Sequence, residues 1–179
     1  GETSVQIASD SYGIGELATR RLIDDGCSRI LCLRNNSRMR MPANKRTDAY
    51  HDVVEQAGLP ALVREVEFVK SDDEKSAVVA KILDENPDID GIFAGDDTMA
   101  AICLNVMKQR GLSAPDDIKV VGADGARRTM TFMPDLTTVR QDIDRIGELA
   151  AQSIIALVNG EKPESNTKLP VELIEGKTA

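Results

Sequence analysis

The sequence has few of the residues that bind metals or form disulfides. Its 179 residues include one histidine and three cysteines. The cysteines, Cys27, Cys32 and Cys103, stand in apolar stretches and form no C-x-x-C pair, which argues against a disulfide framework or a metal cluster. An odd number of scattered cysteines is typical of small core residues in a reducing compartment. We therefore expect a cytoplasmic protein.

Long hydrophobic runs and an excess of positive charge are also missing. No apolar run approaches the roughly 18 residues that a membrane helix needs, and residues 1–4 carry no signal-peptide pattern. We expect no membrane association. Acidic residues outnumber basic ones by 30 to 22, which gives a net charge of −8. Because binding to the phosphate backbone needs a basic surface, this segment by itself is predicted to bind DNA poorly.

Signatures of catalysis are absent as well. The sequence contains no G-x-S-x-G, no P-loop and no recognisable pair of catalytic carboxylates. The single histidine, His51, falls on the polar side of a predicted helix, and we expect it at the surface. These absences disfavour an enzyme, and no cofactor is expected.

Apolar and polar stretches alternate along the chain in a regular way. Short apolar stretches of strand length are separated by segments of about a dozen residues with helical spacing. This alternation is typical of βαβ units, and it predicts a doubly wound α/β fold with a mostly parallel sheet. The polar stretch 161–168 is predicted to be a loop. The predicted strands are 4–8, 29–33, 62–68, 91–94, 119–122, 136–139 and 169–174, and the predicted helices are 12–25, 45–57, 74–85, 98–110 and 142–159.

Polar and charged residues follow four of the predicted strands. They are Asp10 and the segments 35–46, 95–98 and 123–127. In doubly wound folds, ligands bind at the carboxyl ends of the strands. The sequence therefore predicts that these four segments converge on a ligand site.

The same segments carry motifs that occur together in a known family. Residues 10–26 read DSYGIGELATRRLIDDG, residues 88–98 read DIDGIFAGDDT, residues 116–124 read DDIKVVGAD, and residues 134–141 read PDLTTVRQ. In the order and spacing of these motifs the chain resembles the lactose-repressor family of transcriptional regulators over nearly its whole length. The resemblance implies a periplasmic-binding-protein-like fold, mainly its C-terminal subdomain.

The family resemblance also implies a domain organisation. In that family a helix-turn-helix reads DNA, and two α/β subdomains enclose an effector cleft. This chain would lack the DNA-binding domain and the first half of the N-terminal subdomain. Residues 1–26 would end that subdomain, 27–139 would form the C-terminal effector-binding subdomain, 140–160 would be a helix returning to the N-terminal subdomain, and 161–179 would be a C-terminal tail strand.

The partners follow from the same resemblance. The intact protein would bind a small carbohydrate-like effector and would bind operator DNA through the domain absent from this chain. A homodimer is expected, and the apolar stretches 102–107 and 130–133 are candidates for its surface. Packing in the core is the alternative for both stretches.

By resemblance, five residues are candidate ligand contacts. The planar fork of donors on an arginine suits two adjacent oxygens of a ligand, and carboxylates accept hydrogen bonds from vicinal hydroxyls of a sugar. Structural alternatives remain, such as an exposed arginine at a helix start or an Asp-Gly turn. We expect Asp97 to cap the helix 98–110 and not to touch the ligand. The five candidates are Asp10, Arg46, Asp96, Asp124 and Gln141.

The identity of the effector stays open. Ala49 stands where the family usually has glycine, and Ala123 stands where it commonly has an aromatic residue, so the match does not indicate one sugar. Basic residues concentrate in the segment 34–46 and at Arg127 and Arg128. They would suit an anionic effector such as a sugar phosphate, although a solvated basic loop is equally common.

Two other functions share features of this sequence. A solute-binding protein of a sugar transporter would have the same fold and cleft, but the unpaired cysteines and the P-x-L-T-T-V-x-Q motif favour the repressor. Residues 13–18 match G-x-G-x-x-A, a motif of NADP-binding enzymes. In such enzymes the first glycine directly follows the strand, whereas here residues 9–12 intervene, so the spacing disfavours a dinucleotide site.

Overall fold

Six strands form the main sheet of the computed structural model, which describes residues 4–36, 43–67 and 70–179. Their order across the sheet is β3-β2-β4-β5-β6-β8. All neighbouring strands are parallel except β6 and β8, which pair antiparallel. The predicted doubly wound α/β architecture is therefore confirmed. The strands are β2 (Ile30–Asn36), β3 (Leu62–Glu67), β4 (Gly91–Ala94), β5 (Lys119–Asp124), β6 (Thr137–Gln141) and β8 (Val171–Ile174).

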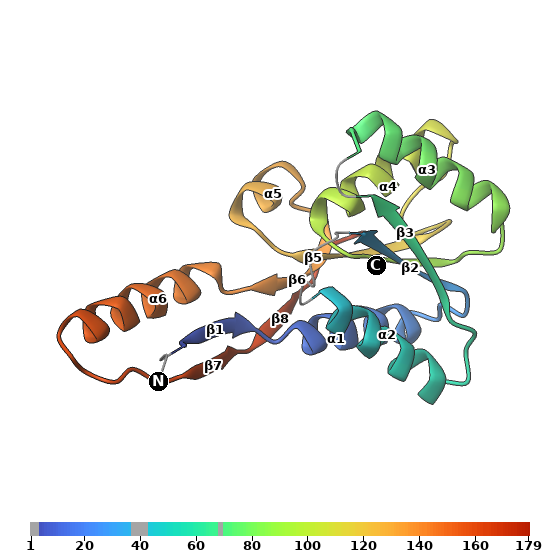
Figure 1. The fold of residues 1–179 in the computed structure, drawn as a ribbon. Coiled ribbons are helices and arrows are strands. Elements are labelled where there is room, and N and C mark those ends of the chain that lie inside the picture. The colour runs from blue at the N-terminus through green and yellow to red at the C-terminus, as the bar shows by residue number, and fades with distance from the viewer. Residues whose placement is uncertain (1–3, 37–42, 68–69) are drawn as a thin grey trace.

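Two pairs of helices cover the two faces of this sheet (Figure 1). The helices α1 (Ser11–Asp24) and α2 (Ala43–Gln56) lie on one face, and α3 (Asp72–Glu85) and α4 (Asp97–Gln109) lie on the other. Because successive side chains of a strand point to opposite faces, each central strand contributes to two cores. Ile30 and Cys32 join the α1–α2 core, whereas Leu31 and Leu33 join the α3–α4 core. Burial on both faces explains the continuous apolar run in β2.

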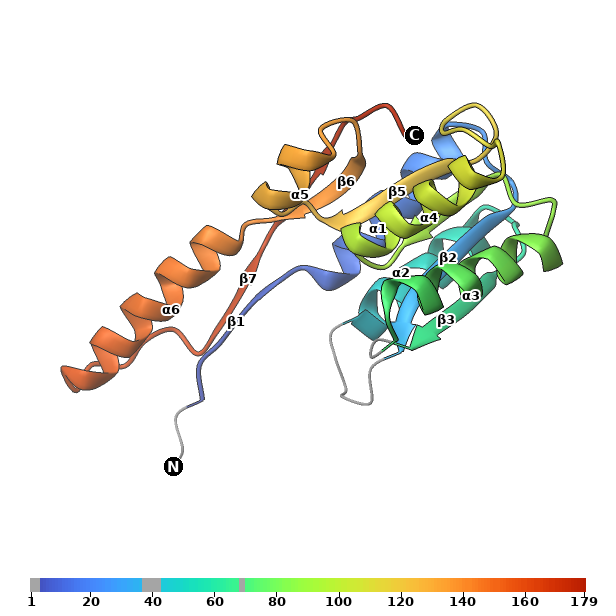
Figure 2. The ribbon, with the colours of Figure 1, turned by 90° about the horizontal axis from the view of Figure 1, so that it is seen from above.

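A second, smaller assembly extends away from the main sheet (Figure 2). It consists of β1 (Gln6–Ser9), which pairs in parallel with β7 (Asn166–Leu169), and of the helix α6 (Ile143–Val158). We call these three elements the arm. The helix α6 has no buried residue, and four large apolar side chains near its end are exposed: Ile154, Ile155, Leu157 and Val158.

The sequence predictions of secondary structure fail in two places along the fold. Residues 161–168 were expected to form a loop, but β7 begins at Asn166 and gains backbone hydrogen bonds from β1. The short helix α5 (Arg127–Phe132) was not predicted. The domain division stays a prediction, and the helix α1, which it places in the segment 1–26, packs against α2, β5 and β8.

The stretch 102–107 is not a dimer surface in this structure. Ile102, Cys103, Val106 and Met107 are buried in the core between α4 and the sheet. The prediction mistook the inward face of an amphipathic helix for an outward one. The expectation for the cysteines is confirmed, since all three are buried and free, and His51 is exposed as predicted.

None of the helices in the described ranges has the length and apolar character that crossing a membrane requires.

Candidate functional site

Three of the five predicted residues meet at the carboxyl ends of β5 and β6. Asp124 ends β5, Gln141 ends β6, and Arg46 lies in the first turn of α2. Nη2 of Arg46 donates to Oδ1 of Asp124 over 2.8 Å, and Nε2 of Gln141 donates to the same oxygen over 2.6 Å. Nη1 of Arg46 donates to the carbonyl oxygen of Gly95, after β4, over 2.5 Å. The arginine thus joins the ends of two neighbouring strands.

The backbone of Asp124 is strained. Its φ of 99° lies in the left-handed region, and among the described residues it is the only one other than glycine with a positive φ. Such a conformation costs on the order of 1–3 kcal/mol and is commonly found at functional sites. Both of these donors use Oδ1 of Asp124. The side chain is 36% exposed, which leaves an oriented acceptor for a ligand.

Asp96 is the N-cap of α4, a role that the sequence analysis gave to Asp97. Oδ1 of Asp96 accepts a hydrogen bond from the amide of Met99 over 2.8 Å. The side-chain amide of Asn35, at the end of β2, donates to Oδ2. Burial raises the pKa of Asp96, although the amide of Met99 opposes the shift. Asp96 adjoins the cluster, but both of its oxygens already have partners.

Asp10 is held by a different set of groups. It caps α1, where Oδ1 accepts from the amide of Gly13 over 3.2 Å, and Oδ2 lies 3.1 Å from Nζ of Lys168 on β7. Burial alone would raise the pKa of Asp10, but the Gly13 amide and the Lys168 ammonium together lower it. These two contacts involve none of the other four candidates. Asp10 therefore links α1 to the arm and is not bonded to the Arg46 cluster.

Asn35 is a member of the site that the sequence analysis did not single out. Its Oδ1 and the Nε of Arg46 are buried and have no hydrogen-bond partner among the described residues. Unpaired buried polar atoms are uncommon and call for an explanation. The segment 35–46 had been noted only as a polar strand end, and one asparagine within it carries no distinguishing pattern.

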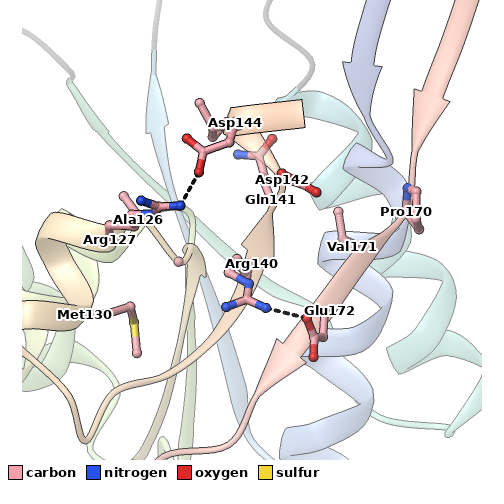
Figure 3. A pocket seen from close by; sticks show the side chains of 12 residues that line it. Ala126, Arg127, Met130, Arg140, Gln141, Asp142, Asp144, Pro170, Val171 and Glu172 are labelled. Carbon is pink, nitrogen blue, oxygen red and sulfur yellow. Dashed lines mark hydrogen bonds and ion pairs between the residues drawn. The ribbon is translucent and has the colours of Figure 1, made fainter. Parts of the chain in front are cut away.

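A pocket of about 670 Å³ adjoins this cluster at Gln141 (Figure 3). It lies between α5, the end of β6, the start of α6 and the β7–β8 junction. Two ion pairs line it: Arg127 with Asp144 at 2.5 Å, and Arg140 with Glu172 at 2.7 Å. The volume is in the range of small-molecule sites. Arg46, Asp96 and Asp124 do not line it, so Gln141 is the residue common to pocket and cluster.

Two arginines of the predicted basic cluster form ion pairs. Arg34 pairs with Glu65 on β3, and Arg127 pairs with Asp144. Arg38 and Arg40 lie outside the described residues. The anionic effector therefore stays a prediction.

Comparison with known proteins assigns the chain to a family. The model of the periplasmic binding protein-like domain matches residues 19–179. This chain is a member of the periplasmic binding protein-like family. The family fold predicted from the sequence is thereby confirmed.

The similar proteins within this family are regulators. The ribose operon repressor of Halalkalibacterium halodurans is 31% identical over 175 residues, which cover 96% of this chain and 51% of the repressor. A periplasmic binding protein/LacI transcriptional regulator from Alkaliphilus metalliredigens, solved with D-xylulofuranose, is 25% identical with a TM-score of 0.86 and covers 99% of this chain and 66% of the regulator. The regulator CelR, solved with cellobiose, is 27% identical with a TM-score of 0.86 over 99% of this chain and 55% of CelR.

The chain spans about half the length of the curated relative it matches. The three relatives named above are called repressors or transcriptional regulators.

Proposed function

We propose that this chain is the effector-binding part of a cytoplasmic DNA-binding transcriptional repressor that senses a small sugar or sugar derivative and catalyses no reaction. The observation that carries the proposal is the convergence of Arg46 and Gln141 on one oxygen of Asp124 at the carboxyl ends of parallel strands. The names of the relatives, a ribose operon repressor and regulators with bound sugars, support it.

The chemistry of the cluster suits a polyhydroxylated ligand. Oδ2 of Asp124 is an acceptor for a hydroxyl, and Arg46 is a charged donor whose side chain is only 14% exposed. A fixed carboxylate and a fixed guanidinium discriminate strongly, because a ligand without matching hydroxyls would leave them unpaired. Asp10 and Asp96 are proposed as outer members of this site.

The mechanism we propose is a shift between two orientations of two subdomains. Residues 27–139 would form most of the effector-binding subdomain, and the tail 161–179 would return to it. Residues 1–26 and the helix within 140–160 would belong to the other subdomain, although α1 packs against the main sheet. A sugar can shift this equilibrium only by binding one orientation more tightly. Operator DNA would be bound by a domain outside this chain, in keeping with the net charge of −8.

A homodimer is part of the proposal. Two heads on one operator require two copies, and Phe132 on α5 is 76% exposed beside the partly buried Met130 and Met133. An exposed aromatic side chain of this kind is typical of an interface anchor.

The proposal is tested by a thermal-shift screen of the protein against D-ribose, D-xylulose, sucrose and cellobiose and their phosphates. A ligand of the folded state raises the unfolding temperature by mass action, so at least one sugar should do so. If calorimetry gives equal affinities for a sugar and its phosphate, the hypothesis that the effector is a sugar phosphate is wrong.

Arg46→Ala should then weaken binding of the responding sugar by at least about 30-fold, because a buried charged donor is lost and its carboxylate partner is left behind. The matched control is Arg64→Ala, which removes an exposed arginine of β3 that donates to the carbonyl oxygen of Val63. If neither variant changes the affinity, the sugar binds somewhere other than this cluster.

A further inference from the structure

Asp97 is a buried carboxylate whose hydrogen bonds leave its own helix. It is 3% exposed and is the first residue of α4, immediately after the N-cap. Oδ2 accepts from the backbone amide of Gly125 over 2.8 Å, and Oδ1 accepts from the hydroxyl of Thr138 over 2.6 Å. The side chain therefore joins α4 to the turn after β5 and to the strand β6.

The two segments that Asp97 holds are those that supply the candidate effector contacts. Gly125 directly follows Asp124, whose left-handed backbone must be held in place by its surroundings. Thr138 lies on β6, three residues before Gln141. A single carboxylate is thus bonded both to the turn that follows Asp124 and to the strand that ends at Gln141.

The glycines around Asp97 keep the necessary space. A Cβ at Gly122 would lie 2.6 Å from Oδ1 of Asp97, and a Cβ at Gly125 would lie 2.7 Å from Cβ of Arg140. Gly122 stands opposite Thr138 in the pairing of β5 with β6. Any side chain at position 122 would displace the carboxylate from the two donors.

We propose that Asp97 is a positioning residue of the effector site, which holds Asp124 and Gln141 in the arrangement where both meet Arg46. The effect on ligand binding rests on the proposed function. The two hydrogen bonds of Asp97, which we call the Asp97 tie, are present without a ligand. Loss of the tie would leave the fold intact and would release the turn that carries Asp124.

The charge of Asp97 sets the strength of the tie. Burial raises its pKa to about 6, the hydroxyl of Thr138 lowers it, and the carboxylate of Asp124 on β5 raises it further. The other charged groups nearby are Asp96 at the same helix end, with Arg46 from α2 and Lys75 from α3 acting on Asp96. Arg140 on β6 is paired with Glu172. Hydrogen bonds to an ionised carboxylate are stronger than those to a neutral one, so the tie tightens above about pH 6.

The test uses NMR of the ligand-free protein and matched variants at Thr138. Thr138→Val removes the hydroxyl at nearly constant shape, whereas Thr138→Ser keeps it. We expect the Gly125 amide to exchange about 10-fold faster in T138V and the side-chain amide of Gln141 to shift. In T138S both should remain as in the unmodified protein, and the amide of Val106, in the middle of α4, should be unchanged in all variants.

A pH titration gives a signature that general destabilisation does not. The Gly125 amide resonance should titrate with a midpoint near 6, and Asp97→Asn should abolish that titration while keeping the shape of the side chain. An unchanged Gly125 amide in T138V, or a titration that persists in D97N, would overturn the inference.

Sugar affinity separates this inference from the proposed function. With the responding sugar of the screen, T138V should weaken binding about 10-fold and T138S should not, because only T138V loosens Asp124. If no sugar binds the unmodified protein, the proposed function fails. The NMR experiment still tests whether Asp97 holds the Gly125 turn and the side chain of Gln141. Equal binding by both Thr138 variants overturns the positioning role.

Discussion

Two neighbouring residues of the candidate site lower the stability of the folded protein. Asp124 adopts a left-handed backbone, and the neighbouring Asp97 is a buried carboxylate. Each feature opposes folding and persists only because its neighbours over-determine it. The cluster with Arg46 and Gln141 is therefore maintained at the expense of stability, as expected of a preorganised binding site.

The pH dependence of stability should reveal the cost of Asp97. Its pKa is about 6 in the folded protein and 3.8 for an unperturbed carboxyl, so the folded state binds the proton more tightly. The stabilisation from protonation is complete below pH 3.8 and is lost as the pH rises through 6. It amounts to at most roughly 3 kcal/mol, since one pKa unit corresponds to about 1.4 kcal/mol.

This prediction is checked by urea unfolding of the unmodified protein and of Asp97→Asn between pH 4.5 and pH 7.5. The difference in the free energy of unfolding between the two proteins should change over this range in favour of D97N at the higher pH, because only the unmodified protein must bury a charge there. A constant difference would mean that Asp97 titrates alike in the folded and unfolded states. Comparison with D97N cancels the titration of the other carboxyls.

The sequence could predict some of these residues and not others, for physical reasons. Arg46, Asp124 and Gln141 come together because they follow or begin elements at the same edge of a parallel sheet. The N-cap of α4 was assigned to Asp97 instead of Asp96 because either of two adjacent aspartates satisfies the pattern of an N-cap. Only the three-dimensional packing shows that the second one points toward β6.

At the scale of elements, the sequence predicts those helices and strands whose apolar side chains pack in the core. The strands and helices of the main sheet lie close to their predicted bounds because their apolar side chains repeat with period 2 or 3.6. The strand β7 reads NTKL, so only its last residue is apolar, and the strand is stabilised by pairing with β1. The helix α5 has six residues and no side-chain cap, so it leaves no signal in the sequence.

The start of α3 offers a prediction at this scale. The Ser71 hydroxyl accepts from the Glu74 amide over 3.3 Å, and a Glu74 carboxylate oxygen accepts from the Ser71 amide over 2.9 Å. This reciprocal capping box should stabilise the helix, and Ser71→Ala should lower the free energy of unfolding by about 1 kcal/mol.

The control for this variant is Ser76→Ala, in the interior of the same helix. The Ser76 hydroxyl donates to the carbonyl of Asp72, a bond that the helix does not need, and alanine has the higher helix propensity. Urea unfolding should therefore give a stability equal to or slightly above that of the unmodified protein. Equal losses in both variants would show that the cap is not the stabilising element.

At the scale of the whole molecule, the candidate site lies where the arm joins the main sheet. Gln141 ends β6, and Asp142 immediately caps α6 through the amide of Arg145. The Arg127–Asp144 pair connects α5 to the first turn of the same helix. A ligand that fixes Gln141 therefore acts on the segment that sets the direction of the arm, which is the differential contact that an allosteric shift requires.

The proposed homodimer gives a prediction for the assembled molecule. If Phe132 anchors the interface, Phe132→Asp should weaken self-association by at least about 30-fold, since an aromatic anchor contributes about 2 kcal/mol or more. Sedimentation of the unmodified protein at micromolar concentration should give the mass of a dimer, and sedimentation of the variant should give the mass of a monomer.

Val158→Asp is the matched control, because Val158 is 81% exposed but belongs to the arm. A dimer that dissociates in V158D and persists in F132D would move the interface from α5 to the apolar end of α6, and an unmodified protein that sediments only as a monomer would remove the dimer altogether.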